Sequence, residues 1–189
     1  MAFLGIPIKI ETARLFSKID VPGTKESLSD LHVTILCFED DWEITELSKA
    51  LEATYDVISD IKPFTIKTKK ITCFPKRGKE PCAIIAKIES DDLQDLNKKL
   101  KKEFDKRNIE YLKTFKDYKP HITLSYSDKE IDSFTIDPIE ISVPEINLLG
   151  GNKGENDIFI SFPLKCPQKK NARLINKINT FYNINKGLL

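Results

Sequence analysis

The chain has 189 residues, of which 40% are hydrophobic and 31% are charged. This length and composition indicate a soluble globular protein with one ordinary domain and a sizeable core. Thirty basic residues against twenty-nine acidic ones give a net charge of +1, which argues against binding of duplex DNA or an anionic membrane through overall charge. Any phosphate group must therefore be bound by a local site.

The cysteines and the lack of a targeting segment indicate a cytoplasmic protein. No C-x-x-C pair is present and no histidine lies at ligand spacing from a cysteine, so no metal and no other cofactor is expected. Cys37, Cys73 and Cys82 lie in apolar, strand-like runs, where a reduced cysteine behaves as a small hydrophobic residue. The N-terminal residues do not read as a signal peptide. No apolar run approaches the ~20 residues of a membrane span.

The beginning of the chain predicts two strands separated by a turn. Isoleucines alternate from Ile6 to Ile10 and predict a first strand within residues 6–16. Residues 21–30 are polar and predict a turn. Residues 31–38, LHVTILCF, are rich in β-branched residues and predict the second strand.

Two segments have the spacing of amphipathic helices. Apolar residues recur at helical intervals within residues 40–59, where Asp40 or Asp41 is the expected N-cap. A second helix is expected over residues 92–107, with Ser90 as the cap and negative charge in the first turn.

The other apolar segments predict strands and set the fold class. Pro138 and Pro144 interrupt one of these segments, which suits edge positions in a sheet. The helices alternate with hairpin-like strand pairs, and this order favours an α+β fold with mostly antiparallel sheets. The segments are residues 64–74, 82–90, 121–126, 134–149 and 158–164.

The end of the chain differs in composition from the rest. Residues 165–189 contain six Lys or Arg and no Asp or Glu. We therefore divide the chain into a domain of residues 1–164 and a basic C-terminal extension of residues 165–189. The extension is expected to be solvated or to dock on the domain as a helix, and contact with nucleic acid or a partner is the alternative.

The only two histidines of the chain occur in the same short frame, His-x-Thr followed by apolar residues. Side chains alternate between the two faces of a strand. His32 and Thr34 should therefore share one face of their strand, and His121 and Thr123 one face of theirs. The opposite faces are expected to enter the core, with Leu31, Val33, Ile35 and Cys37 on the first strand and Ile122, Leu124 and Tyr126 on the second.

Two imidazoles that face each other suit acid–base chemistry near neutral pH, because one can accept a proton while the other donates one. Threonine hydroxyls can donate hydrogen bonds to phosphate oxygens and stabilise the charge that builds up in the transition state. Together these groups are the parts needed to cleave a phosphodiester without a metal ion.

The segments LHVTI and PHITL resemble the paired H-x-T motifs of the 2H phosphoesterase superfamily. Its members include bacterial RNA 2′,3′-cyclic phosphodiesterases (also called 2′-5′ RNA ligases), plant cyclic phosphodiesterases and phage enzymes that degrade cyclic-oligonucleotide defence signals. The resemblance covers roughly residues 6–164. It includes a Phe-Pro pair in the strand–loop–strand of residues 71–89, where Phe74 is expected to be a core or lid residue, and Pro120 directly before the second histidine.

The resemblance implies a bilobal α+β fold, with two pseudo-symmetric antiparallel sheets, helices packed outside and a central cleft. It further implies that His32 and His121 are the catalytic acid and base, in an order that the sequence leaves open. Thr34 and Thr123 are then the phosphate-binding residues.

Five other residues are candidates for substrate binding. Tyr118 and Lys119 enter the second motif from a loop and could reach a base or a phosphate. Lys76 and Arg77 lie in a charged turn and could meet a second phosphate. Ser125 shares the face of the second histidine by simple alternation.

We expect an enzyme, a phosphoric diester hydrolase that cleaves a nucleotide 2′,3′-cyclic phosphate or a 2′-5′ or 3′-5′ linked oligonucleotide, linear or cyclic. One alternative is a phage-type nucleotide-binding protein that sequesters or degrades a cyclic-oligonucleotide defence signal. Another is an RNA-binding accessory protein that uses its basic extension. A monomer is expected, with the nucleotide substrate as its partner.

Overall fold

The computed structural model describes residues 2–38, 44–76, 78–113, 117–150 and 157–165. Asp40, Asp41, Arg77 and the extension from residue 166 onward lie outside the described residues. The helices are α1 (Ile10–Ser17), α2 (Ile44–Ile58) and α3 (Asp91–Lys106). The strands are β1 (Phe3–Pro7), β2 (Thr24–Lys25), β3 (His32–Cys37), β4 (Phe64–Cys73), β5 (Cys82–Glu89), β6 (His121–Ser127), β7 (Phe134–Val143), β8 (Glu145–Gly150) and β9 (Asp157–Pro163).

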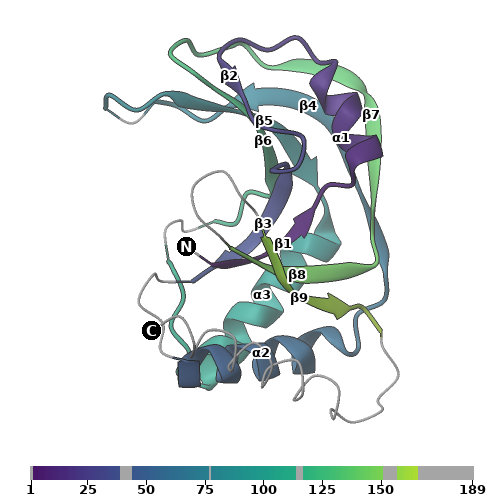
Figure 1. The fold of residues 1–189 in the computed structure, drawn as a ribbon, viewed down its shortest axis with the longest axis vertical. Coiled ribbons are helices and arrows are strands. Elements are labelled where there is room, and N and C mark those ends of the chain that lie inside the picture. The colour runs from purple at the N-terminus through teal and green to yellow at the C-terminus, as the bar shows by residue number, and fades with distance from the viewer. Residues whose placement is uncertain (1, 39–43, 77, 114–116, 151–156, 166–189) are drawn as a thin grey trace.

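The strands form two antiparallel halves that meet between β6 and β3 (Figure 1). One half has the order β7-β4-β5-β6, with β2 added beside β6, and the other has the order β3-β1-β8-β9. The halves are joined through one paired position, Val33 with Ile122, and both side chains are fully buried. The predicted α+β architecture is confirmed, and its two halves are hydrogen-bonded into a continuous sheet.

The two predicted amphipathic helices are present. α2 and α3 pack against each other, α3 also contacts β3, and α2 also contacts β9 (Figure 1). The Ser90 hydroxyl caps α3 by accepting a hydrogen bond from the backbone N–H of Leu93 at 3.2 Å, as its N-cap position predicts. The apolar stripe of α3 is buried and consists of Leu93, Leu96, Leu100 and Phe104.

The prediction for the first strand is wrong in its second half. β1 ends at Pro7, and Ile10 begins α1. The alternation from Ile6 to Ile10 therefore crosses the boundary between two elements. Ala13 and Phe16 decide the helix, because they lie three residues apart and are both buried while Ile10 is 43% exposed.

Two further details of the sheet differ from what the sequence predicts. The predicted turn at residues 21–30 contains β2, a two-residue strand that exists because β6 pairs with it. Pro138 lies in β7, which is an edge strand as predicted. The strand after Pro144, β8, is not an edge strand, because it lies between β1 and β9. Pro144 is tolerated because it falls between β7 and β8 rather than inside a paired strand.

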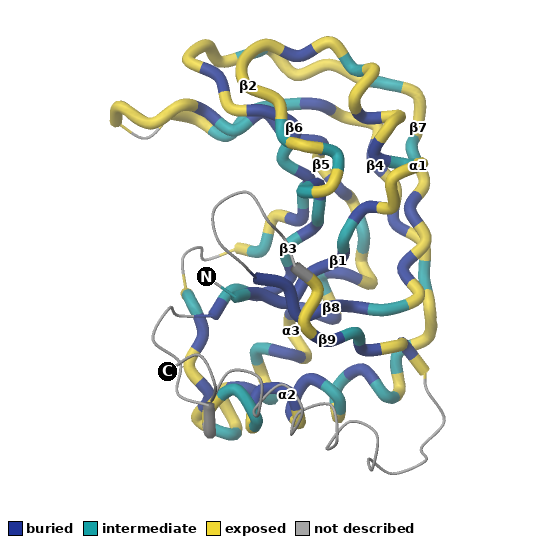
Figure 2. The backbone as a smooth tube through the Cα atoms, viewed as in Figure 1, coloured by how far each residue is buried: buried dark blue, intermediate teal, exposed yellow. Residues whose placement is uncertain are grey.

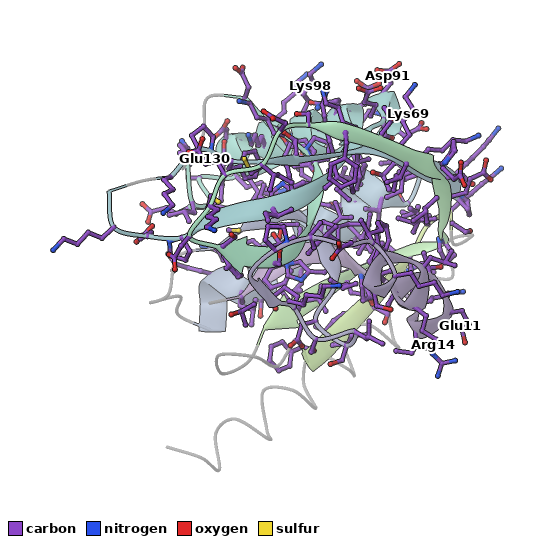
Figure 3. All side chains as sticks on the ribbon, turned by 90° about the horizontal axis from the view of Figure 1, so that it is seen from above. Glu11, Arg14, Lys69, Asp91, Lys98 and Glu130 are labelled. Carbon is purple, nitrogen blue, oxygen red and sulfur yellow. The ribbon has the colours of Figure 1, made fainter. Side chains whose placement is uncertain are left out.

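Burial is concentrated at the junction of the two halves and beneath α2 and α3 (Figure 2). The turn between β4 and β5 projects from the fold and is exposed (Figures 1 and 2). Charged side chains cover the outer surface, for example Glu11 and Arg14 on α1 and Lys98 on α3 (Figure 3). None of the helices in the described segments combines the length and apolar character that crossing a membrane requires.

Candidate active site

The structure brings the four side chains of the two His-x-Thr frames together on one face of the sheet. Continuing the antiparallel register of the junction pair by one residue in each direction places His32 opposite Thr123 and Thr34 opposite His121. Directly opposed residues have Cβ atoms about 4.5–5.5 Å apart. All four residues are half-buried. By this register, a threonine lies across the junction from each histidine.

Each histidine ring is oriented by a backbone carbonyl two residues before it. Nδ1 of His32 lies 2.6 Å from the carbonyl oxygen of Asp30, and Nδ1 of His121 lies 2.7 Å from that of Lys119. A carbonyl oxygen can only accept, so Nδ1 must donate in both rings. Nε2 is therefore the nitrogen through which each ring can take or give a proton.

An aromatic ring packs against each imidazole. The centroids of Phe3 and His32 lie 4.7 Å apart with the rings tilted by 38°. The edge contact of Phe74 with His121 has a centroid distance of 4.8 Å and an angle of 87°. Phe74 is half-buried and therefore belongs to the wall of the site.

The two histidines differ in their electrostatic surroundings. Burial lowers the pKa of both rings below the ordinary value of 6.5. The carbonyl and the carboxylate of Asp30 act in the opposite direction on the pKa of His32. The carbonyl of Lys119 raises the pKa of His121, whereas the charge of His32 lowers it further. The rings are thus close enough to influence each other's protonation.

Each strand of the site contains a β-bulge directly after its threonine. Ile35 is the extra residue of β3 relative to β1, and Leu124 is the extra residue of β6 relative to β5. An extra residue disrupts the ladder and re-aims the side chains that come after it. The two His-x-Thr frames therefore have the same sequence pattern, and each is followed by a bulge at the same position.

The bulge in β6 reverses two predicted side-chain positions. Ser125, predicted to share the face of His121, is fully buried and donates a hydrogen bond to the carbonyl of Pro22 at 2.8 Å. Tyr126, predicted to enter the core, is 44% exposed and lines a cavity together with His121. Ser125 is therefore a structural residue, and Tyr126 takes its place at the site.

The bulge in β3 has the same effect. Cys37, predicted to enter the core, is half-buried and lines the cavity beside His121. Leu36, the residue before it, is buried instead. Cys37 thus occupies on β3 the position that Tyr126 occupies on β6. Burial raises the pKa of its thiol, which keeps the group protonated.

The carbonyl groups of the two bulge residues find partners outside the ladder. The side chain of Asn97, 3% exposed on α3, donates from Nδ2 to the Ile35 carbonyl at 2.7 Å. The backbone N–H of Glu26, directly after β2, donates to the Leu124 carbonyl at 2.9 Å. Leaving such a buried carbonyl unpaired would cost ~1–3 kcal/mol. This accounts for an amide side chain on the apolar face of α3.

Tyr118 and Lys119 lie at the site in different ways. The Tyr118 hydroxyl donates to the Thr34 carbonyl at 2.9 Å, and its own carbonyl accepts from Nε2 of Gln94 at 3.0 Å. Burial raises the pKa of this phenol. Tyr118 therefore ties the loop before β6 to β3 and forms a wall of the site. Lys119 is exposed and lines the same cavity as His121.

The charged turn contributes at the rim of the site. Lys76 is exposed and lines the cavity, and its backbone N–H donates to Oε1 of Glu130 at 3.1 Å. Arg77, the neighbouring candidate, lies outside the described residues.

A cavity of about 600 Å³ is lined by two of the four frame residues, Thr34 and His121. This volume lies in the range of small-molecule sites, ~300–1,000 Å³. Among the described residues, no three His, Cys, Asp or Glu side chains are grouped as metal ligands would be. Residues that line this first cavity include Thr34, Cys37, Phe74, Tyr118, His121 and Tyr126.

Sequence reasoning missed two residues that support the site. Asn97 could have been found, because it is a polar residue inside the apolar stripe of α3. Nothing in the local sequence marks Phe3 as a site residue, because its contact with His32 depends on the pairing of β1 with β3.

Comparison with known proteins identifies relatives of this fold. Residues 12–147 match the family described as AKAP7 2′5′ RNA ligase-like domain. No curated protein sequence gives a match.

Solved structures with the same fold are similar over most of their length. TT0787 of Thermus thermophilus superposes with a TM-score of 0.73 at 20% identity, covering 88% of this chain and 99% of the other. E. coli LigT complexed with NADP+ has a TM-score of 0.65 at 16% identity, covering 87% of this chain and 98% of the other. E. coli LigT complexed with 3′-AMP has a TM-score of 0.59 at 19% identity, covering 87% of this chain and 94% of the other.

Proposed function

The chain belongs to the AKAP7 2′5′ RNA ligase-like domain family, within the 2H phosphoesterase superfamily, and from this premise we propose that it is a metal-independent phosphodiesterase. Family membership supports phosphodiesterase-type activity. The proposed substrate is a nucleotide 2′,3′-cyclic phosphate or a 2′-5′ or 3′-5′ linked oligonucleotide. The observation that carries the proposal is the matched setting of His32 and His121, each with Nδ1 on a carbonyl.

In the proposed reaction, Nε2 of the neutral histidine takes a proton from the attacking water, whose oxygen forms the new bond to phosphorus. The bond from phosphorus to the leaving ribose oxygen breaks, and Nε2 of the protonated histidine donates a proton to that oxygen. Thr34 and Thr123 donate hydrogen bonds to the non-bridging oxygens, whose charge increases in the transition state.

The surrounding charges favour one order of roles. Asp30 favours the protonated form of His32, whereas the charge of His32 favours the neutral form of His121. We therefore assign His32 as the acid and His121 as the base for hydrolysis. Asp30 then acts through His32 as a positioning residue.

The proposal is tested by measuring hydrolysis of adenosine 2′,3′-cyclic phosphate and of 2′-5′ and 3′-5′ linked oligoadenylates in EDTA. His32→Ala and His121→Ala should each reduce kcat by about 10²–10⁴. The double variant should be hardly worse than either single one, because the pair acts as a unit. Loss of wild-type activity in EDTA, or full activity of the double variant, would exclude the mechanism.

A binding measurement separates catalysis from simple sequestration. Calorimetry with adenosine 2′,3′-cyclic phosphate and with a cyclic dinucleotide should be compared with product chromatography on the same samples. Tight binding without product would make the chain a nucleotide-sequestering protein rather than a hydrolase.

A further inference from the structure

The connection from β6 to β7, residues 128–133, is a crossing loop. The strand order β7-β4-β5-β6 puts β4 and β5 between the two strands that this loop joins. The loop therefore covers three strand spacings of about 4.8 Å, about 14 Å in all, which is within the ~20 Å reach of its extended residues. It must pass over the place where β4 ends and β5 begins.

Two cysteine thiols hold the crossing loop at that place. Sγ of Cys82, at the start of β5, donates to the carbonyls of Ser127 at 3.0 Å and Lys129 at 3.2 Å. Sγ of Cys73, at the end of β4, donates to the Ile131 carbonyl at 3.5 Å. Cys82 is 1% exposed. A thiol is a weak donor, and here it gives the carbonyls of an irregular segment a partner in the sheet.

Two further contacts fasten the crossing loop to the chain around the turn between β4 and β5. The backbone N–H of Lys76 donates to Oε1 of Glu130 at 3.1 Å, and the hydroxyls of Thr72 and Ser133 share a hydrogen bond of 2.8 Å. A carboxylate acceptor makes such a bond stronger than a neutral acceptor does. Glu130 lies on the same side of the molecule as the projecting turn (Figure 3). The crossing loop thus contacts both strands at the base of the turn and the turn itself.

The first three residues of this turn, 74–76, form an arm in the wall of the proposed active site. The ring of Phe74 makes the edge contact with His121, with a centroid distance of 4.8 Å. Phe74 and Pro75 line the first cavity and also a second one of about 720 Å³. The turn projects from the fold and is exposed (Figures 1 and 2). The contacts at its base therefore decide where the arm lies.

Resting on the proposed function, we propose that Cys82 and Glu130 are positioning residues, which hold the arm so that the Phe74 ring stays against His121. Neither of the two lines the first or the second cavity, so they act through Phe74 and not on the substrate. The crossing loop contains no residue of either His-x-Thr frame, yet it fixes the surroundings of the proposed base.

The test removes the exposed contact first. Glu130→Ala deletes the acceptor of the Lys76 N–H, whereas Glu130→Gln keeps an acceptor oxygen. Asp132→Ala is the matched control, because Asp132 is exposed in the same loop and makes no hydrogen bond or ion pair within the described part of the chain. Each variant is made in the wild type and in a Phe74→Leu background. The substrates are adenosine 2′,3′-cyclic phosphate and a 2′-5′ linked oligoadenylate.

We expect the effect of Glu130 to depend on Phe74. Glu130→Ala should lower kcat/KM about tenfold in the wild-type background, because a small misplacement at the reacting groups is costly. In the Phe74→Leu background the same change should cost less than about twofold, since the two residues act in series. Glu130→Gln and Asp132→Ala should stay within about twofold of the wild type. Equal losses in both backgrounds, no loss in either, or a tenfold loss in Asp132→Ala would overturn the inference.

Cys82 provides a second, buried test of the same arrangement. Cys82→Ala removes the thiol donor, whereas Cys82→Ser keeps a donor at the same place. Rates are compared below the unfolding temperature of each variant. Cys82→Ala should lower kcat/KM about tenfold, again only when Phe74 is present, and Cys82→Ser should retain it. The same loss in both variants would show that the thiol hydrogen bonds do not position the arm.

A spectroscopic measurement distinguishes failure of this inference from failure of the proposed function. The Phe74 ring current shifts the ring-proton resonances of His121, which are assigned readily because the chain has only two histidines. Glu130→Ala should move these resonances toward their positions in Phe74→Leu, and Asp132→Ala should not. This result without turnover in the wild type would support positioning by the crossing loop and reject the hydrolase. Turnover with unmoved resonances in Glu130→Ala would support the hydrolase and overturn the inference.

Discussion

At the scale of single residues, the two histidines have the same local arrangement but different charged groups near them. Each ring has Nδ1 on the carbonyl of the residue two before it, and each packs against a phenylalanine. The difference is that Asp30 lies near His32, whereas His32 itself is the charged group that acts on His121. The geometry is therefore repeated while the acid–base properties are not.

The rate should depend on pH in a way that reflects these shifts. Above both pKa values the two rings are neutral and no acid remains, and below both they are protonated and no base remains. Because burial lowers both pKa values below 6.5, kcat/KM should be a bell-shaped function of pH with its maximum below pH 6.5. A maximum above pH 7.5 would contradict this prediction.

The coupling behind this profile can be measured on its own. His32→Gln removes the cationic neighbour of His121, so the pKa of His121 should rise toward its ordinary value. His121 is then the only histidine of the chain, and its NMR titration can be followed without overlap. An unchanged pKa would show that the rings do not interact.

Asn97 should matter for both stability and catalysis. Asn97→Leu preserves approximate volume but leaves the Ile35 carbonyl without its partner, so the free energy of unfolding should fall by ~1–3 kcal/mol. Because this carbonyl belongs to the bulge beside Thr34, kcat should fall while KM changes less. Urea unfolding and steady-state kinetics measure the two effects.

The exposed neighbour Lys98 provides the control for Asn97. Lys98→Leu should change the free energy of unfolding by no more than about 0.5 kcal/mol and should leave kcat unchanged. If Asn97→Leu lowers stability but not kcat, the Ile35 bulge does not position Thr34.

At the scale of elements, the short strand β2 holds the end of β6 that carries Tyr126. Gly23 precedes β2 with φ of +91°, and a Cβ atom there would collide with the backbone carbonyl of Tyr126. Glycine is thus required both by conformation and by close approach. Strand β2 pairs with β6 beside the bulge, and the Glu26 N–H donates to the carbonyl of the bulge residue Leu124.

Gly23→Ala should therefore loosen β2 from β6. Gly78→Ala is a matched control, because Gly78 has φ of +61° but open space around it. The control should show only the strain of a left-handed residue, ~1–2 kcal/mol. Gly23→Ala should cost more and should also expose the β6 amides to hydrogen exchange. Equal losses in both variants would show that the contact with β6 contributes nothing.

At the scale of the whole molecule, the proposed active site lies where the two halves of the sheet meet through Val33 and Ile122. Each half supplies one histidine and one threonine. The proposed catalysis therefore depends on the alignment of the halves as well as on their separate stability.

Ile122→Ala should reveal this dependence. It should destabilise the fold by ~2–5 kcal/mol, as for other fully buried isoleucines. Ile71→Ala, at an equally buried position in β4, should cost a similar amount but leave kcat/KM almost intact below its unfolding temperature. A similar loss of kcat/KM in both variants would show that the junction has no special role.

The amino-acid sequence alone was enough to predict the elements whose signals are local. Helical spacing and the Ser90 cap predicted α2 and α3, and period-two alternation predicted that His32 and Thr34, like His121 and Thr123, share a face. These predictions rest on neighbours within a few residues, so no information from distant parts of the chain was needed.

The course of each strand after its threonine depends instead on long-range pairing. The bulges at Ile35 and Leu124 arise from the register with β1 and β5, and nothing in the local pattern marks the extra residue. They turn Ser125 into the core and bring Tyr126 and Cys37 to the site. Strand register depends on pairing between segments that are far apart in the chain, which is the physical reason that alternation alone could not place these three side chains.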